Sequence, residues 1–258
     1  MFLRKCYMYI KEKSMFIVLQ SILFCLIISC TKQQINTGNN IYTPPRNNDT
    51  TMTDTLHESN FTWLALGDSY TIGQSVTEQE RFPAQTISLL KASNILFTNL
   101  EYIAITGWTT QNLLDGIAQK NPQGPFDVVS LLIGVNDQYQ HLDTAGYRIR
   151  FTACLAKAIE LAGNNKEHVF VLSIPDYSVT PFAKNMDTAQ ISKEVDTFNA
   201  INKAITLSYN ISYTEITTLT REAKNDISLI ATDGLHPSGK EYAQWAALLE
   251  EVIGEKLK

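Results

Sequence analysis

The sequence lacks the patterns that mark several large functional classes. It has only four cysteines in 258 residues, at positions 6, 25, 30 and 154, and no two of them form a C-x-x-C pair. A zinc ribbon or a dithiol redox motif is therefore not expected. The sequence also contains no P-loop, no G-x-G-x-x-G and no H-E-x-x-H, the patterns of nucleotide, dinucleotide and zinc-protease sites. We accordingly expect no cofactor and no metal.

Charge of one sign is not concentrated anywhere along the chain. The formal net charge is -5, and no block of like charges occurs, so a nucleic-acid partner is not expected. Hydrophobic residues make up 44% of the chain and charged residues 18%. This is an ordinary globular composition, in a chain long enough for one sizeable α/β core.

The only long apolar run lies near the N-terminus and is typical of a targeting signal. Lys11 and Lys13 precede a run over 15–28 that is broken only by Gln20 and Ser21 and is too short to span a bilayer comfortably. Ile-Ile-Ser before Cys30 resembles a bacterial lipobox. We therefore expect residues 1–29 to be a lipoprotein signal peptide and Cys30 to be the lipidated N-terminus, with an uncleaved signal anchor as the alternative.

Residues 30–60 form a polar segment rich in Asn, Thr and Gln, with a Pro-Pro pair and no periodicity. Such a composition favours a flexible tether. The expected organisation is therefore a signal peptide, a tether over 30–60 and a catalytic domain over 61–258. The expected location is the bacterial cell envelope, either periplasmic or on the cell surface, with the lipid on Cys30 holding the protein to a membrane.

From residue 61 onward, apolar strand-like runs alternate with segments of helical spacing. Strands are predicted over 61–66, 95–105, 127–133, 168–174 and 211–216. Helices are predicted over 81–92, 110–120, 143–162 and 188–207, with a last helix capped by Ser238. This alternation predicts an α/β fold: a single doubly wound, parallel, five-stranded sheet with helices on both faces.

Residues capable of acyl-transfer chemistry follow three of the predicted strands. Ser69 comes after the first strand, Gly107 after the second and Asn136 after the third, while Asp233 and His236 lie just before the last helix. Because sites in such sheets form beyond the carboxyl ends of the strands, we expect these residues to meet there. Ser69 would then be a nucleophile, His236 its base and Asp233 the group that orients the imidazole. An isolated Asp-x-x-His would more simply be a surface ion pair.

The chain resembles the SGNH (GDSL) hydrolase family in four stretches, which extend over most of the region from Phe61 onward: Gly67-Asp68-Ser69, Thr106-Gly107-Trp108, Gly134-Val135-Asn136-Asp137 and Asp233-Gly234-Leu235-His236-Pro237. The resemblance implies a flavodoxin-like fold and an oxyanion hole. Its donors would be the backbone N–H groups of Ser69 and Gly107 and the side-chain amide of Asn136. Glycine at 107 would allow close backbone approach, although an asparagine often precedes this glycine in the family and Thr106 stands here.

Other residues near these motifs have two interpretations. Tyr70, Trp108 and Asp176 could line a substrate pocket or could pack structurally, whereas Asp68 and Asp137 are expected to fix their loops through backbone N–H groups. The absence of a G-x-S-x-G elbow around Ser69 disfavours the α/β-hydrolase fold.

The predicted function is a lipid-anchored serine esterase. Its substrate would be a small ester, an acylated sugar or a lysolipid. The alternative is a catalytically silent surface lipoprotein that binds carbohydrate or lipid on the same fold.

Overall fold

A computed structural model describes residues 60–258 of the chain. The predicted signal peptide, the lipidation site Cys30 and the polar tether lie outside the described residues. Within 60–258, no helix is both long enough and apolar enough to cross a membrane.

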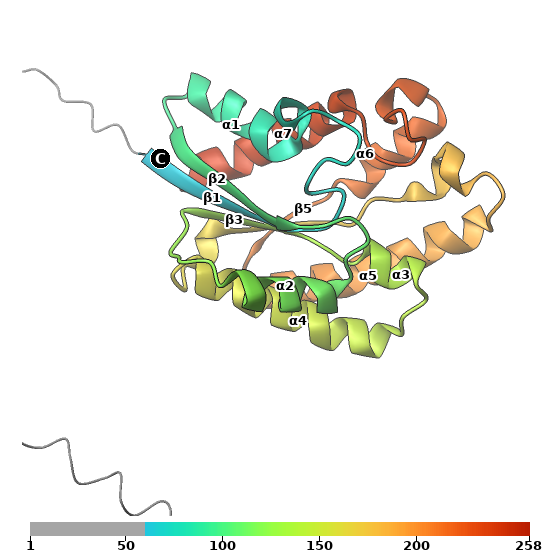
Figure 1. Ribbon diagram of the computed structural model, residues 1–258, viewed down its shortest axis with the longest axis horizontal. Helices are drawn as coiled ribbons and strands as arrows, with labels where there is room; N and C mark the ends of the chain where they lie inside the picture. Colours follow the sequence, from blue (N-terminus) through green and yellow to red (C-terminus); the bar gives the residue numbers. More distant parts are fainter. Residues whose placement is uncertain (1–59) are drawn as a thin grey trace, which may run out of the picture. The chain divides into compact units, whose positions relative to one another are not determined.

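A five-stranded parallel sheet in the order β2-β1-β3-β4-β5 forms the centre of this region (Figure 1). The strands are β1 Asn60–Gly67, β2 Leu96–Ala104, β3 Val128–Leu132, β4 Val169–Leu172 and β5 Ser212–Thr214. The chain winds outward from β1 in one direction to β2 and in the other through β3 to β5. This arrangement confirms the predicted doubly wound sheet, and the reversal of strand order falls between β1 and β3.

Helices cover both faces of the sheet (Figure 1). One face carries α1 Phe82–Ala92 and α7 Gly239–Lys256, while α2 Thr110–Lys120, α4 Thr144–Leu161 and α5 Thr188–Ser208 cover the other. Side chains cap several of these helices: Thr109 accepts from the Asn112 N–H, Asp143 from the Gly146 N–H and Ser238 from the Glu241 N–H. Each cap satisfies a backbone donor that the helix cannot pair internally, so the sequence fixes where these helices begin.

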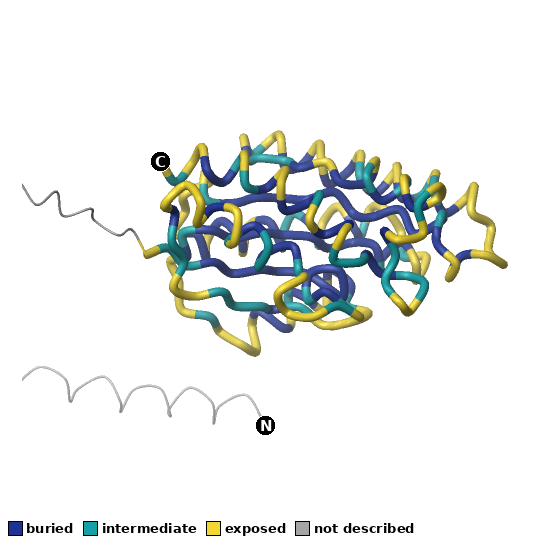
Figure 2. Tube along the Cα trace, turned by 90° about the horizontal axis from the view of Figure 1, so that it is seen from above, coloured by how far each residue is buried: buried dark blue, intermediate teal, exposed yellow. Residues whose placement is uncertain are grey.

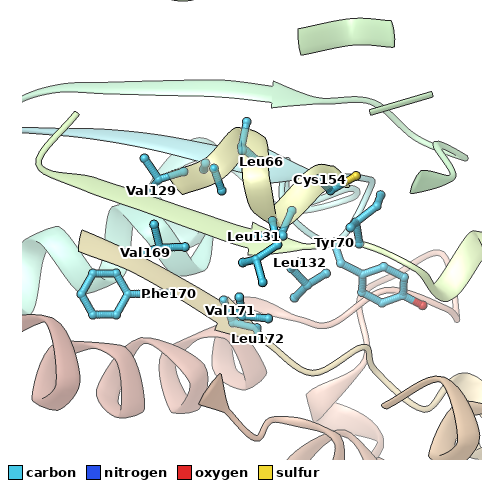
Figure 3. Close-up of a cluster of buried hydrophobic side chains, with 14 of the residues drawn as sticks. Leu66, Tyr70, Val129, Leu131, Leu132, Cys154, Val169, Phe170, Val171 and Leu172 are labelled. Atoms are coloured by element: carbon cyan, nitrogen blue, oxygen red, sulfur yellow. The ribbon is translucent and has the colours of Figure 1, made fainter. Parts of the chain in front are cut away.

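The centre of the sheet is buried (Figure 2), and hydrophobic side chains cluster there (Figure 3). All five residues of β3 and all four of β4 are buried, as the continuous apolar runs predicted for strands covered on both faces. Trp63 of β1 is fully buried and donates its indole N–H to the Ser130 hydroxyl at 3.0 Å. Each fully buried Leu, Val or Phe side chain here contributes roughly 1.5–3 kcal/mol through removal from water.

Helices α1 and α7 pack through large aromatic side chains. The Phe82 ring of α1 lies 6.2 Å from the Tyr242 ring and 5.9 Å from the Trp245 ring of α7, measured between centroids. All three residues are fully buried. The last helix is thereby fixed against the helix that follows the first strand, which positions the loop just before α7 close to the end of β1.

The long elements agree with the sequence prediction, and the short ones differ. The helix predicted over 110–120 has those bounds, and the one predicted over 188–207 ends one residue later. His168, predicted to begin a strand, instead lies in a 3-10 turn, Lys166–His168, so β4 is shorter than predicted. The helices α3 Val135–Tyr139 and α6 Thr217–Arg221 were not predicted, because five residues are too few to show a helical period.

Candidate active site

The turn that follows β1 brings Ser69 to the carboxyl edge of the sheet. Gly67 ends the strand, and a Cβ at this position would collide with the Thr71 hydroxyl and the Leu132 carbonyl oxygen, so only glycine fits. The buried Asp68 carboxylate accepts from the Tyr70 N–H at 3.0 Å. Burial raises the pKa of Asp68 to about 7, although the Tyr70 N–H lowers it. The predicted role of Asp68 in fixing this loop is confirmed.

Ser69 opens onto a cavity of about 140 Å³. Gly107, Asn136 and His236 line the same cavity, so the structure brings these predicted residues together with Ser69. Within residues 60–258, the Ser69 hydroxyl donates no hydrogen bond to another side chain. Transfer of its proton to His236 therefore requires a hydrogen bond that forms when substrate binds, as commonly occurs in catalytic sites.

Asp233 and His236 form a hydrogen-bonded pair on one tight loop. His236 Nδ1 lies 2.6 Å from Asp233 Oδ2, and Asp233 Oδ1 accepts the N–H groups of Leu235 at 2.9 Å and His236 at 3.0 Å. Gly234 permits the reversal because its φ is +72°. Partial burial raises the pKa of Asp233, but donors from Ser75, His236 and the backbone outweigh it and hold the pKa well below its usual range.

Tyr70 packs against the imidazole of His236 and lines the cavity. Its ring centroid lies 4.9 Å from that of His236, and its carbonyl oxygen accepts the Tyr242 hydroxyl at 2.9 Å. Burial raises the pKa of the Tyr70 phenol well above its ordinary value, so the group stays neutral. Both interpretations of Tyr70, as pocket wall and as packing residue, therefore apply.

The backbone N–H groups of Ser69 and Gly107 are available to an incoming ligand. Within residues 60–258, neither N–H donates a hydrogen bond. Gly107 has a φ of +83°, and a Cβ built there would meet no atom within 4 Å. The left-handed backbone conformation favours glycine here, and Gly107 lines the open cavity, so close approach of its N–H to a ligand stays a prediction.

Asn136 lies in the first turn of α3, after Gly134, which has a φ of +131°. Its amide nitrogen Nδ2 donates to the Trp108 carbonyl oxygen at 3.0 Å and lies 3.4 Å from Asp68 Oδ2. The bond to Trp108 is well formed, whereas the second is long, which leaves that N–H weakly engaged. The amide is thus oriented by the nucleophile turn and by the Gly107 loop together.

Asp137, next to Asn136, fixes the start of α2. Its carboxylate accepts the Thr110 N–H at 2.7 Å and the Thr110 hydroxyl at 2.6 Å, and Arg150 pairs with it at 3.2 Å. The expectation that Asp137 fixes its loop rather than takes part in the reaction agrees with these contacts.

Two of the three predicted pocket residues lie away from the cavity. The Trp108 ring packs against Gly116 of α2, where a Cβ would collide with it. Asp176 is buried and bound by Arg221 at 2.8 Å and by Ser192 at 2.7 Å, which makes it part of a structural ion network. Trp108 and Asp176 thus have packing roles here, and neither of them lines this cavity.

An aromatic rim borders the cavity, and two of its residues, Tyr139 and Phe182, were not identified from the sequence. Tyr139, Tyr177 and Phe182 line it with ring centroids 6.1–6.2 Å apart, and Tyr139 and Phe182 are 46% and 40% exposed. Their positions depend on α3 and on the 3-10 turn Pro181–Ala183, neither of which was predicted. The one available signal was an aromatic residue three positions after Asn136. Among the described residues, no cluster of three His, Cys, Asp or Glu side chains could hold a metal.

The edge of this parallel sheet carries a serine, a histidine–aspartate pair and free backbone donors around one cavity. Such an arrangement is suited to ester hydrolysis. Sequence comparison agrees: residues 65–244 match the model of the GDSL-like lipase/acylhydrolase family. The chain therefore belongs to this family and is an esterase-type hydrolase. No curated protein matches the chain in sequence.

Solved structures with the same fold are distant in sequence. A member of the lipolytic protein G-D-S-L family from Veillonella parvula is 22% identical, with a TM-score of 0.56 over 74% of this chain and 96% of that one. The psychrotrophic esterase EstA from Pseudoalteromonas sp. is 17% identical (TM-score 0.57, coverage 76% and 98%). The acetylxylan esterase Axe2 from Geobacillus stearothermophilus is 19% identical (TM-score 0.56, coverage 75% and 94%). At these identities the likeness establishes the fold alone.

Proposed function

We propose that the protein hydrolyses carboxylic esters through an acyl-enzyme formed on Ser69. The observation that carries this proposal is the Asp233–His236 pair, joined at 2.6 Å, on a cavity that Ser69 also lines. A hydroxyl is a weak nucleophile without a neighbouring base, and an imidazole fixed through Nδ1 presents Nε2 as that base.

In the first half-reaction the Ser69 oxygen attacks the ester carbonyl carbon while His236 takes the hydroxyl proton. The tetrahedral intermediate collapses, the C–O bond to the alcohol breaks and His236 returns the proton to the leaving alkoxide. Water then attacks the acyl-enzyme by the same steps and releases the carboxylic acid. Asp233 stays ionised throughout, since its lowered pKa keeps it a carboxylate that stabilises the imidazolium.

Negative charge develops on the carbonyl oxygen in both half-reactions. The N–H groups of Ser69 and Gly107 have no other acceptor within residues 60–258. Asn136 lines the same cavity, and one N–H of its amide is only weakly engaged, by Asp68 at 3.4 Å. We assign these three groups to the oxyanion hole. Donors fixed in advance stabilise the transition state because the protein does not have to reorganise around the new charge.

The cavity favours a short acyl group. Its volume of about 140 Å³ supports a short acyl group, and its exposed aromatic rim offers an apolar surface to the remainder of the substrate. Small esters and acylated sugars fit this geometry better than lysolipids. The activity named for Axe2, acetylxylan esterase, is consistent with the acylated-sugar class.

Labelling with a fluorophosphonate probe tests the enzyme proposal directly. We expect the probe to label wild-type protein at Ser69, identified by peptide mass spectrometry, and to leave Ser69→Ala unlabelled. Ser88→Ala, at an exposed serine on α1, is the matched control and should label as wild type does. Failure to label the folded wild-type protein would favour the catalytically silent binding protein instead.

We further propose that the enzyme is anchored to a bacterial membrane through a lipid on Cys30, with residues 30–60 as the tether and residues 61–258 as the catalytic domain. The lipobox-like residues before Cys30 support this. Cys30→Ala is expected to abolish metabolic labelling by an alkynyl fatty acid and to move the protein out of the membrane fraction. Cys25→Ala is the control. Membrane association that survives in Cys30→Ala would indicate the uncleaved anchor.

A further inference from the structure

A hydroxyl from the nucleophile's own loop binds the carboxylate of the Asp233–His236 pair. Ser75 Oγ donates to Asp233 Oδ2 at 2.7 Å, across 158 positions of sequence. We propose that Ser75 is a positioning residue of the esterase, whose hydroxyl fixes the Asp233 carboxylate in the orientation that holds His236. This inference rests on the proposed function and adds a residue to it that the family motifs do not contain.

The four hydrogen bonds to Asp233 show why Ser75 matters. Oδ1 accepts two backbone N–H groups of the loop, while Oδ2 accepts the His236 ring at 2.6 Å and the Ser75 hydroxyl at 2.7 Å. A carboxylate has about four acceptor positions, so this one is fully satisfied. Three of the donors come from the Asp233 loop itself. Of these four donors, Ser75 is the one that comes from the segment that carries the nucleophile.

The backbone around Ser75 is held in an unusual conformation. Its φ is +69°, a left-handed value that serine seldom adopts, and the preceding turn is closed by a bond from the Gln74 N–H to the Ser69 carbonyl oxygen at 3.0 Å. Gln74 Oε1 also accepts the Thr106 hydroxyl at 2.7 Å, beside Gly107. Gln74 and Ser75 thus connect the Ser69 turn to the Gly107 loop and to the Asp233 loop. A strained backbone conformation such as that of Ser75 is retained where it positions functional groups.

The Ser75 hydroxyl affects the pKa of the Asp233 carboxyl. Within the described residues no lysine or arginine pairs with Asp233, so its charge is stabilised by neutral donors and the imidazole. Of these donors Ser75 lowers the pKa of Asp233 most. The Tyr70 and Tyr242 phenols interact with the Asp233 charge, and the Asp68 carboxyl and the Arg81 guanidinium also act on Tyr242. Burial raises the pKa of both phenols well above 10, and that of Asp68 to about 7.

Loss of the Ser75 hydroxyl should change both the rate and its pH dependence. Without this donor the Asp233 carboxylate is less well satisfied, so it stabilises the imidazolium more strongly and the neutral base appears only at higher pH. We expect Ser75→Ala to lower kcat roughly tenfold, the effect of one hydrogen bond to a charged group. The acid limb of kcat/KM should move upward by about half a pH unit. Asp68 titrates in wild type and in Ser75→Ala alike, so it does not contribute to the difference between their pH profiles.

The experiment measures kcat and kcat/KM against pH for hydrolysis of p-nitrophenyl acetate by wild type, Ser75→Ala and Ser75→Gly. Glycine adopts a positive φ without strain and alanine does not, but both substitutions remove the hydroxyl. Equal shifts of the acid limb in both variants support the proposal. Recovery of wild-type behaviour in Ser75→Gly would assign the effect to the backbone and overturn it, as would an unchanged profile in both variants.

A second measurement distinguishes a specific effect of the Ser75 hydroxyl on Asp233 from a general loosening of the loop. In an Asp233→Asn background, Ser75→Ala should cause little further loss, because Ser75 acts through the carboxylate. Additive losses in the double variant would overturn the proposal. The proposed function is tested independently: fluorophosphonate labelling of Ser69 and loss of activity in Ser69→Ala sustain the esterase mechanism even if Ser75 proves dispensable.

Discussion

Replacing Ser69 with alanine is expected to lower kcat for a short-chain p-nitrophenyl ester by roughly 10⁴-fold or more. The reason is that the hydroxyl oxygen forms the bond to the acyl carbon, and among the described residues Ser69 is the one serine that lines the cavity with the His236 imidazole. The oxyanion donors and the binding surface remain, so a small residual rate over water is expected. The measurement is steady-state hydrolysis, with the probe-labelled active fraction as the reference.

Ser69→Ala should keep the native fold. Ser69 Oγ makes no side-chain hydrogen bond in the described part of the chain, so the thermal midpoint of unfolding should stay close to that of wild type. His236→Ala should cause a loss of similar size, and the double variant should be no worse than either single one, because nucleophile and base act as a unit. Turnover by Ser69→Ala close to that of wild type would refute the assignment of the nucleophile.

Replacing Asn136 with alanine is expected to lower kcat on the order of 10²–10³-fold with little change in KM. The amide would donate to the oxygen only as negative charge develops there, so its removal acts on the transition state rather than on bound ester. The steady-state constants of Asn136→Ala, measured with the same ester as for Ser69→Ala, report the two effects separately.

Asn136 also contacts the Trp108 carbonyl oxygen at 3.0 Å, so its loss could loosen the Gly107 loop. Thr106→Ala is the appropriate control, because it removes another bond that holds this loop, the one to Gln74 at 2.7 Å, without removing the amide donor. We expect Thr106→Ala to lower kcat far less than Asn136→Ala. A change in Asn136→Ala confined to KM, or an equal loss in the control, would remove Asn136 from the oxyanion hole.

The sequence predicted the sheet and the convergence of the site because both depend on patterns that local chemistry enforces. Apolar runs of strand length and helical spacings of three or four turns can be read without the fold. Once strands are assigned as parallel, Ser69, Gly107 and Asn136 must lie at one edge. The Asp233–His236 pair was predictable for a similar reason, since three residues and a glycine suffice to close that turn.

The features that the sequence did not reveal depend on how loops meet. Ser75 is a serine in an ordinary polar stretch, and only the packing of α7 against α1 brings Asp233 to it. Tyr139 and Phe182 form a rim because a five-residue helix and a 3-10 turn place them together. For Trp108 the sequence left pocket lining and packing open, because position in a motif does not show which way a side chain points. Its ring packs against Gly116 of α2.

The attachment of α7 to α1 through Phe82, Tyr242 and Trp245 has a consequence for biosynthesis. The base and its carboxylate lie just ahead of α7, so they reach the nucleophile only after that last helix has docked beside the first. A chain still emerging from the ribosome, with β1 to β5 already translated, would carry Ser69 but no imidazole to activate it. The site is therefore complete only once the segment that follows β5 has been synthesised, because both members of the Asp233–His236 pair lie in it.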